Sequence, residues 1–436
     1  MEKVKVIGAG LAGCEATYYL ARKGISVELY DIKPNSFTPA HKSELFGELV
    51  CSNSLKNNDI YSNAAGLLKQ EMRMLGSLIM EAADNTKVPA GGALAVNRED
   101  FSAYVTEKIK SLENVTIISK EVEDIDFDEY TVIATGPLTT DKLSKRISSI
   151  VGEGLYFFDA SAPIVEFSSI DMEQAFFGDR YGKGNGDHVN CPMNKEQYEE
   201  FLEQLLNAER VELKSFESSA VFEGCMPVEV MASRGKDTLR FGPLKPVGLD
   251  DPRTGRWAYA TLQLRKEDKD GSLYNMVGFQ TNLKFQEQKR VFSIIPALRN
   301  AEFVRYGVMH RNTFINSPSV LSDDYSLKEH PKTFFAGQIT GVEGYVESAG
   351  SGLMCAIYLE RKLKGKKSVR VSDKTVSGAL IKYITTQNQD FQPMNANFGI
   401  LPPAEIMTKD KALKKKMQAE RSLKEISNFI KEINDD

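Results

Sequence analysis

The first pattern with chemical meaning is a glycine-rich loop near the start of the sequence, followed about 20 residues later by an aspartate. In such a loop, Gly8 would permit a tight turn, Gly10 would let the backbone approach a pyrophosphate, and Gly13 would let a helix pack closely on a sheet. The N–H groups at the helix start would bind phosphate, and Asp31 would accept hydrogen bonds from ribose hydroxyls. This spacing predicts a dinucleotide site, although sites for NAD, FAD and some for S-adenosylmethionine share the outline. The predicted binding residues here are Gly8, Ala9, Gly10, Leu11, Ala12, Gly13 and Asp31.

Two of the five cysteines, Cys51 and Cys225, lie in polar or turn-like segments where a thiol could react. Lys56 follows Cys51 closely enough in sequence to help favour a thiolate, and Arg234 and Arg240 follow Cys225. The local sequences leave two interpretations open for both thiols: a reactive group, or a small buried hydrophobe. A buried, structural role is expected for the remaining cysteines, which are Cys14, Cys191 and Cys355.

Strands and helices alternate around the glycine loop in the order that a nucleotide-binding fold requires. Residues 3–7 alternate and are β-branched, which predicts a central strand. A helix is expected over residues 14–23 and a second strand over residues 26–30, which ends immediately before Asp31. These elements would position the glycine loop and the aspartate at the same edge of a parallel sheet.

Two later strands that end in glycine indicate which dinucleotide is bound. Residues 130–136 are typical of the returning strand of two-dinucleotide flavoproteins, and residues 333–337 predict another short apolar strand. A glycine-rich loop and a helix expected over residues 353–363 follow, an order that presents backbone N–H groups to a flavin. We therefore expect noncovalently bound FAD, and no separate nicotinamide domain because the glycine motif does not recur. The expected contacts are Gly136, Gly337, Gly341, Val342, Glu343 and Gly344; ordinary turn and helix-packing roles are the alternative for Gly341, Gly344, Gly350 and Gly352.

The rest of the chain predicts a discontinuous FAD-binding domain with an insertion. Residues 62–83 are expected to form one long helix whose apolar residues are mostly core, and Asn97 to cap another helix. Short strands and helices replace this pattern further on, with the clearest helix over residues 195–208. The predicted class is α/β: a Rossmann-type two-dinucleotide FAD-binding domain, discontinuous, with an inserted α+β domain. The expected divisions are residues 1–155, 156–307 and 308–436, the last with a basic helical tail.

Composition excludes several classes of protein. The 436 residues include 55 Lys and Arg and 60 Asp and Glu, so the formal net charge is −5, and an RNA partner would need a local basic patch. Apolar stretches are too short to cross a bilayer, and no signal peptide is expected, which favours the cytoplasm. The scattered cysteines and the four histidines lack metal-ligand spacing, so neither a disulfide framework nor a metal site is expected.

Taken together, these segments resemble the folate- and FAD-dependent tRNA uracil-5-methyltransferase family, formally the methylenetetrahydrofolate–tRNA-(uracil-5-)-methyltransferases. Larger flavoproteins that modify the wobble uridine share the glycine-rich segments but carry an extra C-terminal helical domain. The segments that carry the resemblance cover nearly the whole chain and are residues 8–13, 48–56, 88–98, 190–194, 222–229, 239–248, 309–313, 337–352 and 392–399.

The resemblance implies the reaction. A one-carbon unit from 5,10-methylenetetrahydrofolate, reduced with electrons from NADH or NADPH through FAD, becomes the methyl group at C5 of uridine 54 in the T loop of tRNA. Uracil C5 is a poor nucleophile until a group such as a thiolate adds at C6, and a base must then remove the C5 proton. Cys225 is assigned as the nucleophile and Cys51 as base or partner, although these two roles are exchangeable and either thiol could serve mainly in positioning.

The resemblance also directs attention to His310 and to several basic residues. The His310 imidazole is expected to lie flat against the pterin of folate, and a histidine held by loop hydrogen bonds is the alternative. Arg234 and Arg240 are expected to steer a flipped uridine. The basic runs 361–370 and 409–424, with Lys414 and Lys415 in the second, would contact phosphates or form a solvated face.

Three functions compete on the sequence alone: the tRNA methyltransferase, the same chemistry on a uridine of ribosomal RNA, and an FAD oxidoreductase or assembly protein that handles no RNA. The two thiols and the His310 segment argue against the third. The sequence leaves open whether the protein is a monomer or a homodimer.

Overall fold

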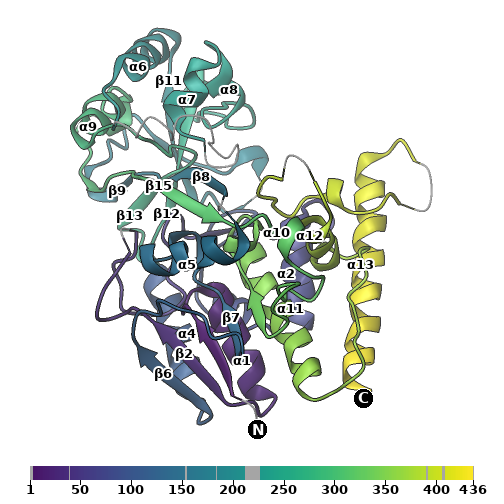
Figure 1. The fold of residues 1–436 in the computed structure, drawn as a ribbon. Helices are drawn as coiled ribbons and strands as arrows, with labels where there is room; N and C mark the ends of the chain where they lie inside the picture. Colours follow the sequence, from purple (N-terminus) through teal and green to yellow (C-terminus); the bar gives the residue numbers. More distant parts are fainter. Residues whose placement is uncertain are drawn as a thin grey trace.

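The computed structural model describes residues 3–38, 40–152, 155–182, 184–211, 226–388, 391–404 and 408–435, and for residues 155–160 and 309–312 it describes the backbone only. Figure 1 shows two lobes, a lower one around a parallel sheet and an upper one around an antiparallel sheet. Each lobe has its own large cluster of buried apolar side chains. Among the described residues, no helix is long and apolar enough to cross a membrane.

A five-stranded parallel sheet forms the centre of the lower lobe, in the order β16-β7-β1-β2-β6. Its middle strand β1 is flanked on both sides and buries Val4 and Val6 completely, as expected for a β-branched strand with neighbours on either edge. The Rossmann-type class predicted from the sequence is thereby confirmed. The strands are β1 (Val4–Ile7), β2 (Val27–Asp31), β6 (Val115–Ser119), β7 (Tyr130–Ile133) and β16 (Thr333–Phe335).

Two helices follow the glycine-rich segments after β1 and β16 and pack against each other, α1 (Leu11–Arg22) and α11 (Tyr345–Leu363). At their contact, a Cβ on Gly352 would lie only 2.2 Å from the Ala12 carbonyl oxygen, so the close approach requires glycine. The prediction that Gly350 and Gly352 belong to a loop before a helix over 353–363 is therefore wrong. The helix begins at Tyr345, and Gly352 is a helix-packing glycine.

The single helix predicted over residues 62–83 is also wrong, because the chain turns at Gly76, whose φ is +78°. Helix α2 (Ala64–Met74) ends before this turn, and α3 (Leu78–Asn85) begins after Ser77, whose hydroxyl accepts from the Met80 N–H. Apolar spacing continues through the break because both helices pack on the same core. The small sheet beside them contains β3 (Ser54–Asn57), β4 (Lys87–Val88) and β5 (Ala93–Val96).

Buried carboxylates hold helix starts together in this lobe. Glu15 of α1 accepts hydrogen bonds from the N–H groups of Leu78 and Ile79 at the start of α3, and from the Ser77 hydroxyl. Glu71 of α2 does the same for α12 (Val376–Thr385), through the N–H groups of residues 376 and 377 and the hydroxyl of residue 377. It also accepts from the hydroxyl of Ser422 in α13 (Lys411–Asn434). Such anions complement the partial positive charge of a helix N-terminus.

The remaining helices of the lower lobe surround these elements. Asn97 caps α4 as predicted, accepting from the N–H groups of Glu99 and Asp100. Three further helices complete this lobe: α4 (Arg98–Lys110), α5 (Asp141–Val151) and α10 (Ser317–Val320).

The upper lobe is a six-stranded antiparallel sheet with helices, in the order β10-β11-β12-β13-β9-β14. Its first long helix, α6 (Lys195–Asn207), begins at a capping box formed by Asn194 and Gln197. The strands are β9 (Ile164–Glu166), β10 (Phe176–Phe177), β11 (His188–Met193), β12 (Ala260–Lys266), β13 (Leu273–Met276) and β14 (Phe303–Arg305). The other helices are α7 (Val228–Ser233), α8 (Thr238–Phe241) and α9 (Phe285–Phe292).

An antiparallel pair of strands, β8 (Leu155–Ala160) and β15 (Met309–Phe314), connects the two lobes. Figure 1 shows this pair where the lobes meet. The domain limits expected after residues 155 and 307 fall at these strands, and the independence of the two lobes stays a prediction.

Candidate active site

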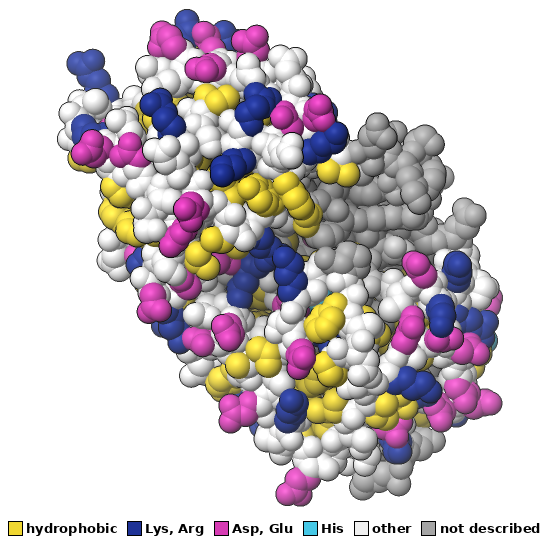
Figure 2. All heavy atoms as spheres, turned by 90° about the vertical axis from the view of Figure 1, so that its left-hand side faces the viewer, with side chains coloured by type: hydrophobic (Ala, Val, Ile, Leu, Met, Phe, Trp, Pro, Cys, Tyr) yellow, Lys and Arg dark blue, Asp and Glu magenta, His cyan; other side chains and the backbone are white. Residues whose placement is uncertain are grey.

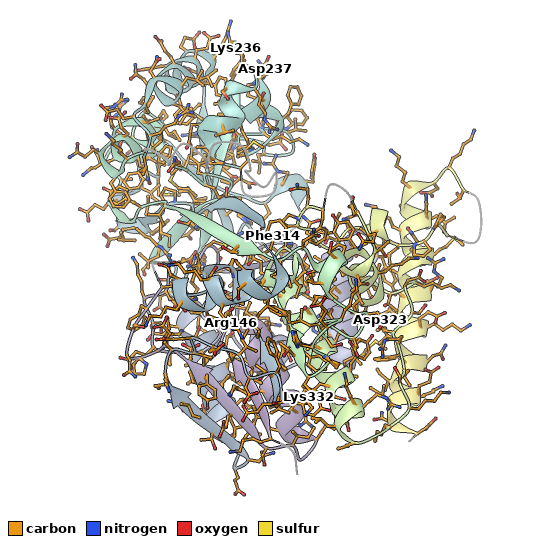
Figure 3. The ribbon with its side chains drawn as sticks, viewed as in Figure 1. Arg146, Lys236, Asp237, Phe314, Asp323 and Lys332 are labelled. Carbon is orange, nitrogen blue, oxygen red and sulfur yellow. The ribbon has the colours of Figure 1, made fainter. Side chains whose placement is uncertain are left out.

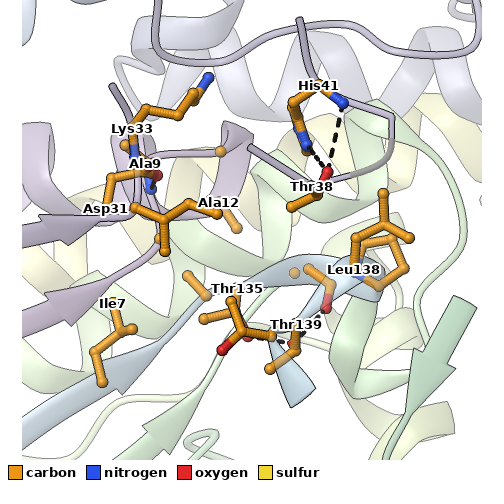
Figure 4. Close-up of a pocket in the computed structure, with 18 of the residues that line it drawn as sticks. Ile7, Ala9, Ala12, Asp31, Lys33, Thr38, His41, Thr135, Leu138 and Thr139 are labelled. Carbon is orange, nitrogen blue, oxygen red and sulfur yellow. Dashed lines mark hydrogen bonds between the residues drawn. The ribbon is translucent and has the colours of Figure 1, made fainter. Parts of the chain in front are cut away.

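A deep cleft opens at the carboxyl ends of the parallel strands, where open α/β sheets bind ligands. The open space of the cleft, including the solvent at its mouth, amounts to about 1140 Å³. Figure 4 shows its lining. Of the residues predicted from sequence to hold the cofactor, those that line it are Gly8, Ala9, Gly10, Leu11, Ala12, Asp31, Gly136 and Gly337.

The glycine loop, residues 8–13, has the tight geometry that a pyrophosphate requires. Gly8 has φ of +101°, and a Cβ there would lie 2.6 Å from the Ala134 carbonyl oxygen. A Cβ on Gly13 would lie 1.8 Å from the Gly8 carbonyl oxygen. A Cβ on Gly10 would meet nothing within 4 Å, so at this position the backbone faces open space. The loop therefore fits a dinucleotide: two glycines close the turn, and the third leaves its backbone accessible.

Asp31 at the end of β2 fixes the glycine loop. Its Oδ2 accepts a hydrogen bond from the Ala9 N–H at 2.6 Å, and its Oδ1 accepts from the Lys33 N–H at 2.9 Å. A carboxylate has about four acceptor positions, so these two bonds leave capacity for ribose hydroxyls. Sequence reasoning did not identify His41, which also lines the cleft; its Nδ1 lies 2.6 Å from the Thr38 hydroxyl, and burial lowers its pKa.

The predicted flavin segment after β16 divides into two parts. Residues 341–344 do not line the cleft: Val342 is buried, and the Glu343 carboxylate accepts from the Gln338 side-chain amide at 2.7 Å. Their positive-φ glycines turn the chain into α11. The cleft is lined instead by three residues that sequence reasoning missed, Gln338, Tyr345 and Ser348. Placing the helix start at Tyr345, rather than at residue 353, could have revealed Tyr345 and Ser348.

Cys51 lies in a loop at the rim of this cleft, which we call the thiol loop (residues 49–53). Val50, next to Cys51 in sequence, and Glu48, three residues before it, line the cleft, as does Tyr345. The Tyr345 hydroxyl lies 3.0 Å from the Cys51 sulfur and accepts hydrogen bonds from the N–H groups of Cys51 and Ser52, at 2.7 and 3.2 Å. Tyr345 therefore connects the thiol to the predicted cofactor site.

Three arginines from distant segments hold the thiol loop. Arg305 of β14 donates to the Val50 carbonyl at 2.7 Å, and Arg98 of α4 donates to the Leu49 carbonyl at 3.0 Å. Arg265 of β12 donates to the side chains of residues 52 and 53, at 2.8 and 3.1 Å. One carboxylate, Glu267, forms an ion pair with Arg98.

This arrangement concentrates positive charge around the thiol loop. Burial lowers the pKa of both Arg265 and Arg305, and Arg265 is only 9% exposed. An excess of guanidinium over carboxylate favours a thiolate or another anion beside it. On the face shown in Figure 2, Lys and Arg side chains gather where the two lobes meet.

Lys56, expected from the sequence to help favour a thiolate at Cys51, has a partner on α11. Its ammonium forms an ion pair with Glu347 of α11 at 2.8 Å, and its backbone adopts a positive φ of +65°. The cationic groups that contact the thiol loop are the arginines, which sequence proximity did not indicate. Lys69, fully buried in α2, donates to the carbonyls of residues 55, 56 and 57 and so fixes β3, the strand that follows the thiol loop.

Cys225 lies outside the described residues. His310 lies in β15, where its backbone pairs with that of Asp159. Arg234, at the end of α7, is exposed. Arg240 lies over the Tyr259 ring at 3.6 Å and pairs with Asp237, which Figure 3 labels at the far end of the upper lobe. The structure thus brings Cys51, but not Arg240, to the cleft.

The two basic runs, residues 361–370 and 409–424, differ in the contacts and exposure of their side chains. Arg361 is buried and donates to the carbonyls of Lys367 and Ile433, which joins α11 to the end of α13. In α13, Lys414 is exposed, whereas Lys415 donates to the Ser62 carbonyl at 3.2 Å. The run 361–370 therefore includes a buried arginine with a structural role, whereas the run 409–424 has more of its charged side chains in solvent.

Comparison with known proteins agrees with this architecture. Residues 3–367 match the profile of the family described as glucose inhibited division protein A. Curated relatives called methylenetetrahydrofolate–tRNA-(uracil-5-)-methyltransferase TrmFO include proteins of Acetivibrio thermocellus, 56% identical over 99% of both chains, and of Natranaerobius thermophilus, 56% identical over 98% of this chain and 99% of the relative. The solved structure of GidA from Aquifex aeolicus shares the fold, with a TM-score of 0.73 and 16% identity over 99% of this chain and 76% of that one. The chain therefore belongs to the glucose inhibited division protein A family and, within it, to the methylenetetrahydrofolate–tRNA-(uracil-5-)-methyltransferases.

Proposed function

We propose that this protein methylates C5 of uridine 54 in the T loop of tRNA, with 5,10-methylenetetrahydrofolate as carbon donor and FAD reduced by NADH or NADPH. One observation carries the proposal: Tyr345 lines the dinucleotide cleft and contacts the Cys51 sulfur, so a thiol adjoins the cofactor site. The names of the relatives give the same substrate and donor.

The residues of the cleft fit FAD. The first N–H groups of α1 lack intrahelical acceptors, as at every helix start, and they would bind the pyrophosphate above the Gly10 backbone. Asp31 would hold a ribose, while Gly136 and Gly337 leave the cleft open beside them. Bound FAD would supply the hydride that a carbon at the formaldehyde level needs to become a methyl group.

The thiols would activate the uracil. A thiolate that adds to C6 forms a carbon–sulfur bond and moves an electron pair toward C5 and the C4 oxygen, which makes C5 nucleophilic. C5 would then bond to the one-carbon unit, a base would take the C5 proton, and the electron pair of that C–H bond would re-form the C5–C6 double bond as the thiolate leaves. The bond from the one-carbon unit to its carrier nitrogen would break as the hydride is added, which leaves a methyl group. We assign the nucleophile to Cys225 and the base or partner to Cys51. The guanidinium groups around the thiol loop would stabilise the anionic forms.

His310 is proposed as the flat partner of the pterin. Replacement by Ala should weaken folate-dependent turnover and leave the FAD content intact. If FAD is lost together with activity, the residue has a structural role instead. Arg234, Arg240, Lys414 and Lys415 are proposed as RNA contacts.

The test uses the FAD-loaded protein with undermodified tRNA or, separately, ribosomal RNA, plus methylenetetrahydrofolate and NADH or NADPH. Mass spectrometry of nuclease fragments should locate 5-methyluridine in the T loop. Methylation of ribosomal RNA alone would change the target, and pyridine nucleotide oxidation without methylated RNA would indicate an oxidoreductase that handles no RNA. Equal methylation from S-adenosylmethionine without folate would refute the proposal.

A matched pair of cysteine variants tests the role of the thiol loop. Cys51→Ala should lower turnover at least about a hundredfold, because it removes a group that exchanges protons or bonds during the reaction. Cys191→Ala serves as control, since this cysteine is fully buried in the upper sheet, and its turnover should stay near that of the parent protein. Equal activity of the two variants would exclude Cys51 from the chemistry.

A further inference from the structure

We propose that the Tyr345 hydroxyl donates its proton to the Cys51 sulfur and is a positioning residue that holds this thiol as a thiolate at the rim of the cleft. The inference rests on the proposed function for its purpose, but its geometry and its test do not depend on RNA or folate. It assigns Tyr345 a role distinct from lining the cofactor cleft.

The hydrogen-bond capacity of a phenol determines the direction of the bond. A tyrosine hydroxyl has one proton to donate and two lone pairs that accept. The N–H groups of Cys51 and Ser52 both point at the Tyr345 oxygen and occupy its accepting positions, at 2.7 and 3.2 Å. The remaining direction is that of its own proton, and the Cys51 sulfur lies 3.0 Å away. The phenol therefore donates and the sulfur accepts.

The reverse direction would cost free energy. A thiol proton directed at the Tyr345 oxygen would bring a third donor to an oxygen that already accepts twice. The phenol proton would then need another acceptor, and a buried hydroxyl without one costs about 1–3 kcal/mol. Burial also raises the pKa of Tyr345 well above its usual value, so the phenol keeps the proton that it donates.

The charged groups that face the thiol favour the same state. Among the described residues, they include Arg265 of β12, Arg305 of β14, Arg98 of α4 and Glu267 just after β12. The three guanidinium groups outnumber the one carboxylate, and that carboxylate is paired with Arg98. When Cys51 loses its proton to solvent, the sulfur keeps the hydrogen bond donated by Tyr345, which is stronger to an anion, and lies in a positive environment.

The position of Tyr345 explains why this residue can reach both sites. It is the first residue of α11, immediately after Gly344, whose φ of +117° brings the chain sharply into the helix. Its ring lines the cleft while its hydroxyl reaches the thiol loop. A group bound in the cleft would therefore touch the same side chain that orients the sulfur.

The test is the pH dependence of Cys51 alkylation by iodoacetamide in the FAD-loaded protein, followed by mass spectrometry of the Cys51 peptide. The rate profile gives the pKa of this thiol separately from its accessibility, because accessibility changes the plateau and not the midpoint. In Tyr345→Phe the midpoint should rise by about one unit, which slows alkylation about tenfold below the midpoint. Tyr358→Phe is the matched control, because Tyr358 is a buried tyrosine of the same helix whose hydroxyl accepts from the Val371 N–H.

A second variant guards against misfolding of the first. Site-specific 3-fluorotyrosine at position 345 keeps the ring and both accepted bonds but is a stronger donor, so the Cys51 midpoint should fall. An unchanged midpoint in both variants, or a fall in Tyr345→Phe, would overturn the proposal. Because alkylation needs no substrate, loss of the methyltransferase assignment would leave this result standing.

Discussion

The glycine loop and the thiol loop adjoin the same cleft but are built in opposite ways. In the glycine loop, one short segment supplies nearly everything: Gly8 and Gly13 close the turn, and Asp31 fastens it through the Ala9 N–H. The thiol loop is held by side chains from four elements that lie far apart in the sequence, on α4, β12, β14 and α11. Backbone geometry governs the first region, and long-range side-chain contacts govern the second.

Because the two loops are built differently, substitutions in them should have different effects. A substitution in the glycine loop places atoms where backbone already lies, so it should affect folding and cofactor content together. A substitution around the thiol loop removes a contact between lobes and should leave the cleft intact. The following predictions separate these two outcomes.

The largest effect is expected for Gly13→Ala. The new Cβ would lie 1.8 Å from the Gly8 carbonyl oxygen, and backbone cannot yield as a flexible side chain could. We expect little soluble folded protein and no bound flavin, measured by yield, circular dichroism and flavin absorbance.

Gly10→Ala is the matched comparison, because its Cβ would meet no protein atom within 4 Å. This variant should fold normally and lose FAD affinity by at least about tenfold, since the methyl group would occupy space needed at the pyrophosphate. If both variants fold and bind flavin alike, the account of the glycine loop is wrong.

The next effect tests the thiol loop. Arg98→Met removes the partner of Glu267, which is 6% exposed, and leaves a buried carboxylate without its cation. The free energy of unfolding should fall by about 3–5 kcal/mol, while FAD content in the folded protein stays unchanged. Urea denaturation and flavin absorbance measure the two quantities.

Arg73→Met is its control, because Arg73 of α2 forms a bidentate but solvent-accessible pair with Asp84 of α3. Its loss should cost no more than about 1 kcal/mol. Equal destabilisation by the two variants would show that the buried Arg98–Glu267 ion pair stabilises the fold no more than a solvent-accessible pair does.

The smallest expected effect concerns pH. Burial raises the pKa of Glu15 to about 7, despite the hydrogen bonds it accepts at the start of α3. Between about pH 4.5 and pH 7 the native carboxyl binds its proton more tightly than the unfolded one, so its contribution to stability falls as pH rises. Relative to Glu15→Gln, the parent protein should lose up to about 3 kcal/mol between about pH 5 and pH 8.

Urea denaturation at the two pH values measures this difference. Glu113→Gln, a substitution of an exposed carboxylate, should show no such pH-dependent difference. A rising rather than falling contribution of Glu15 would show that the helix start compensates its burial fully.

The contrast between the loops also explains what the sequence could reveal. The roles of four residues could be predicted because a local requirement restricts each position to one or two residue types; these are Gly8, Gly10, Gly13 and Asp31. The strands around them were predicted correctly for the same reason. The partners of Cys51 were not predicted, because nothing local distinguishes Arg265 or Arg305 from solvent-exposed arginines. Lys56 was expected to favour a thiolate because it is close to Cys51 in sequence. In the structure its backbone has a positive φ and its ammonium forms an ion pair with Glu347.

Helix ends account for the errors in the fold. Apolar spacing continued across Gly76, and glycines persisted into α11, so periodicity alone placed the break of one helix and the start of the other incorrectly. The positive φ of Gly76 and the close packing of Gly352 against Ala12 are seen only in the folded structure. The same misplacement concealed Tyr345.

Glu71 has a consequence for trimming the chain. Its carboxylate accepts from two N–H groups and a hydroxyl at the start of α12 and from the Ser422 hydroxyl of α13. Deleting the last helix would uncover this buried carboxyl group on one side and remove one of its donors. A version of this protein without α13 should therefore need Glu71 replaced as well. The last helix is part of the core of the lower lobe.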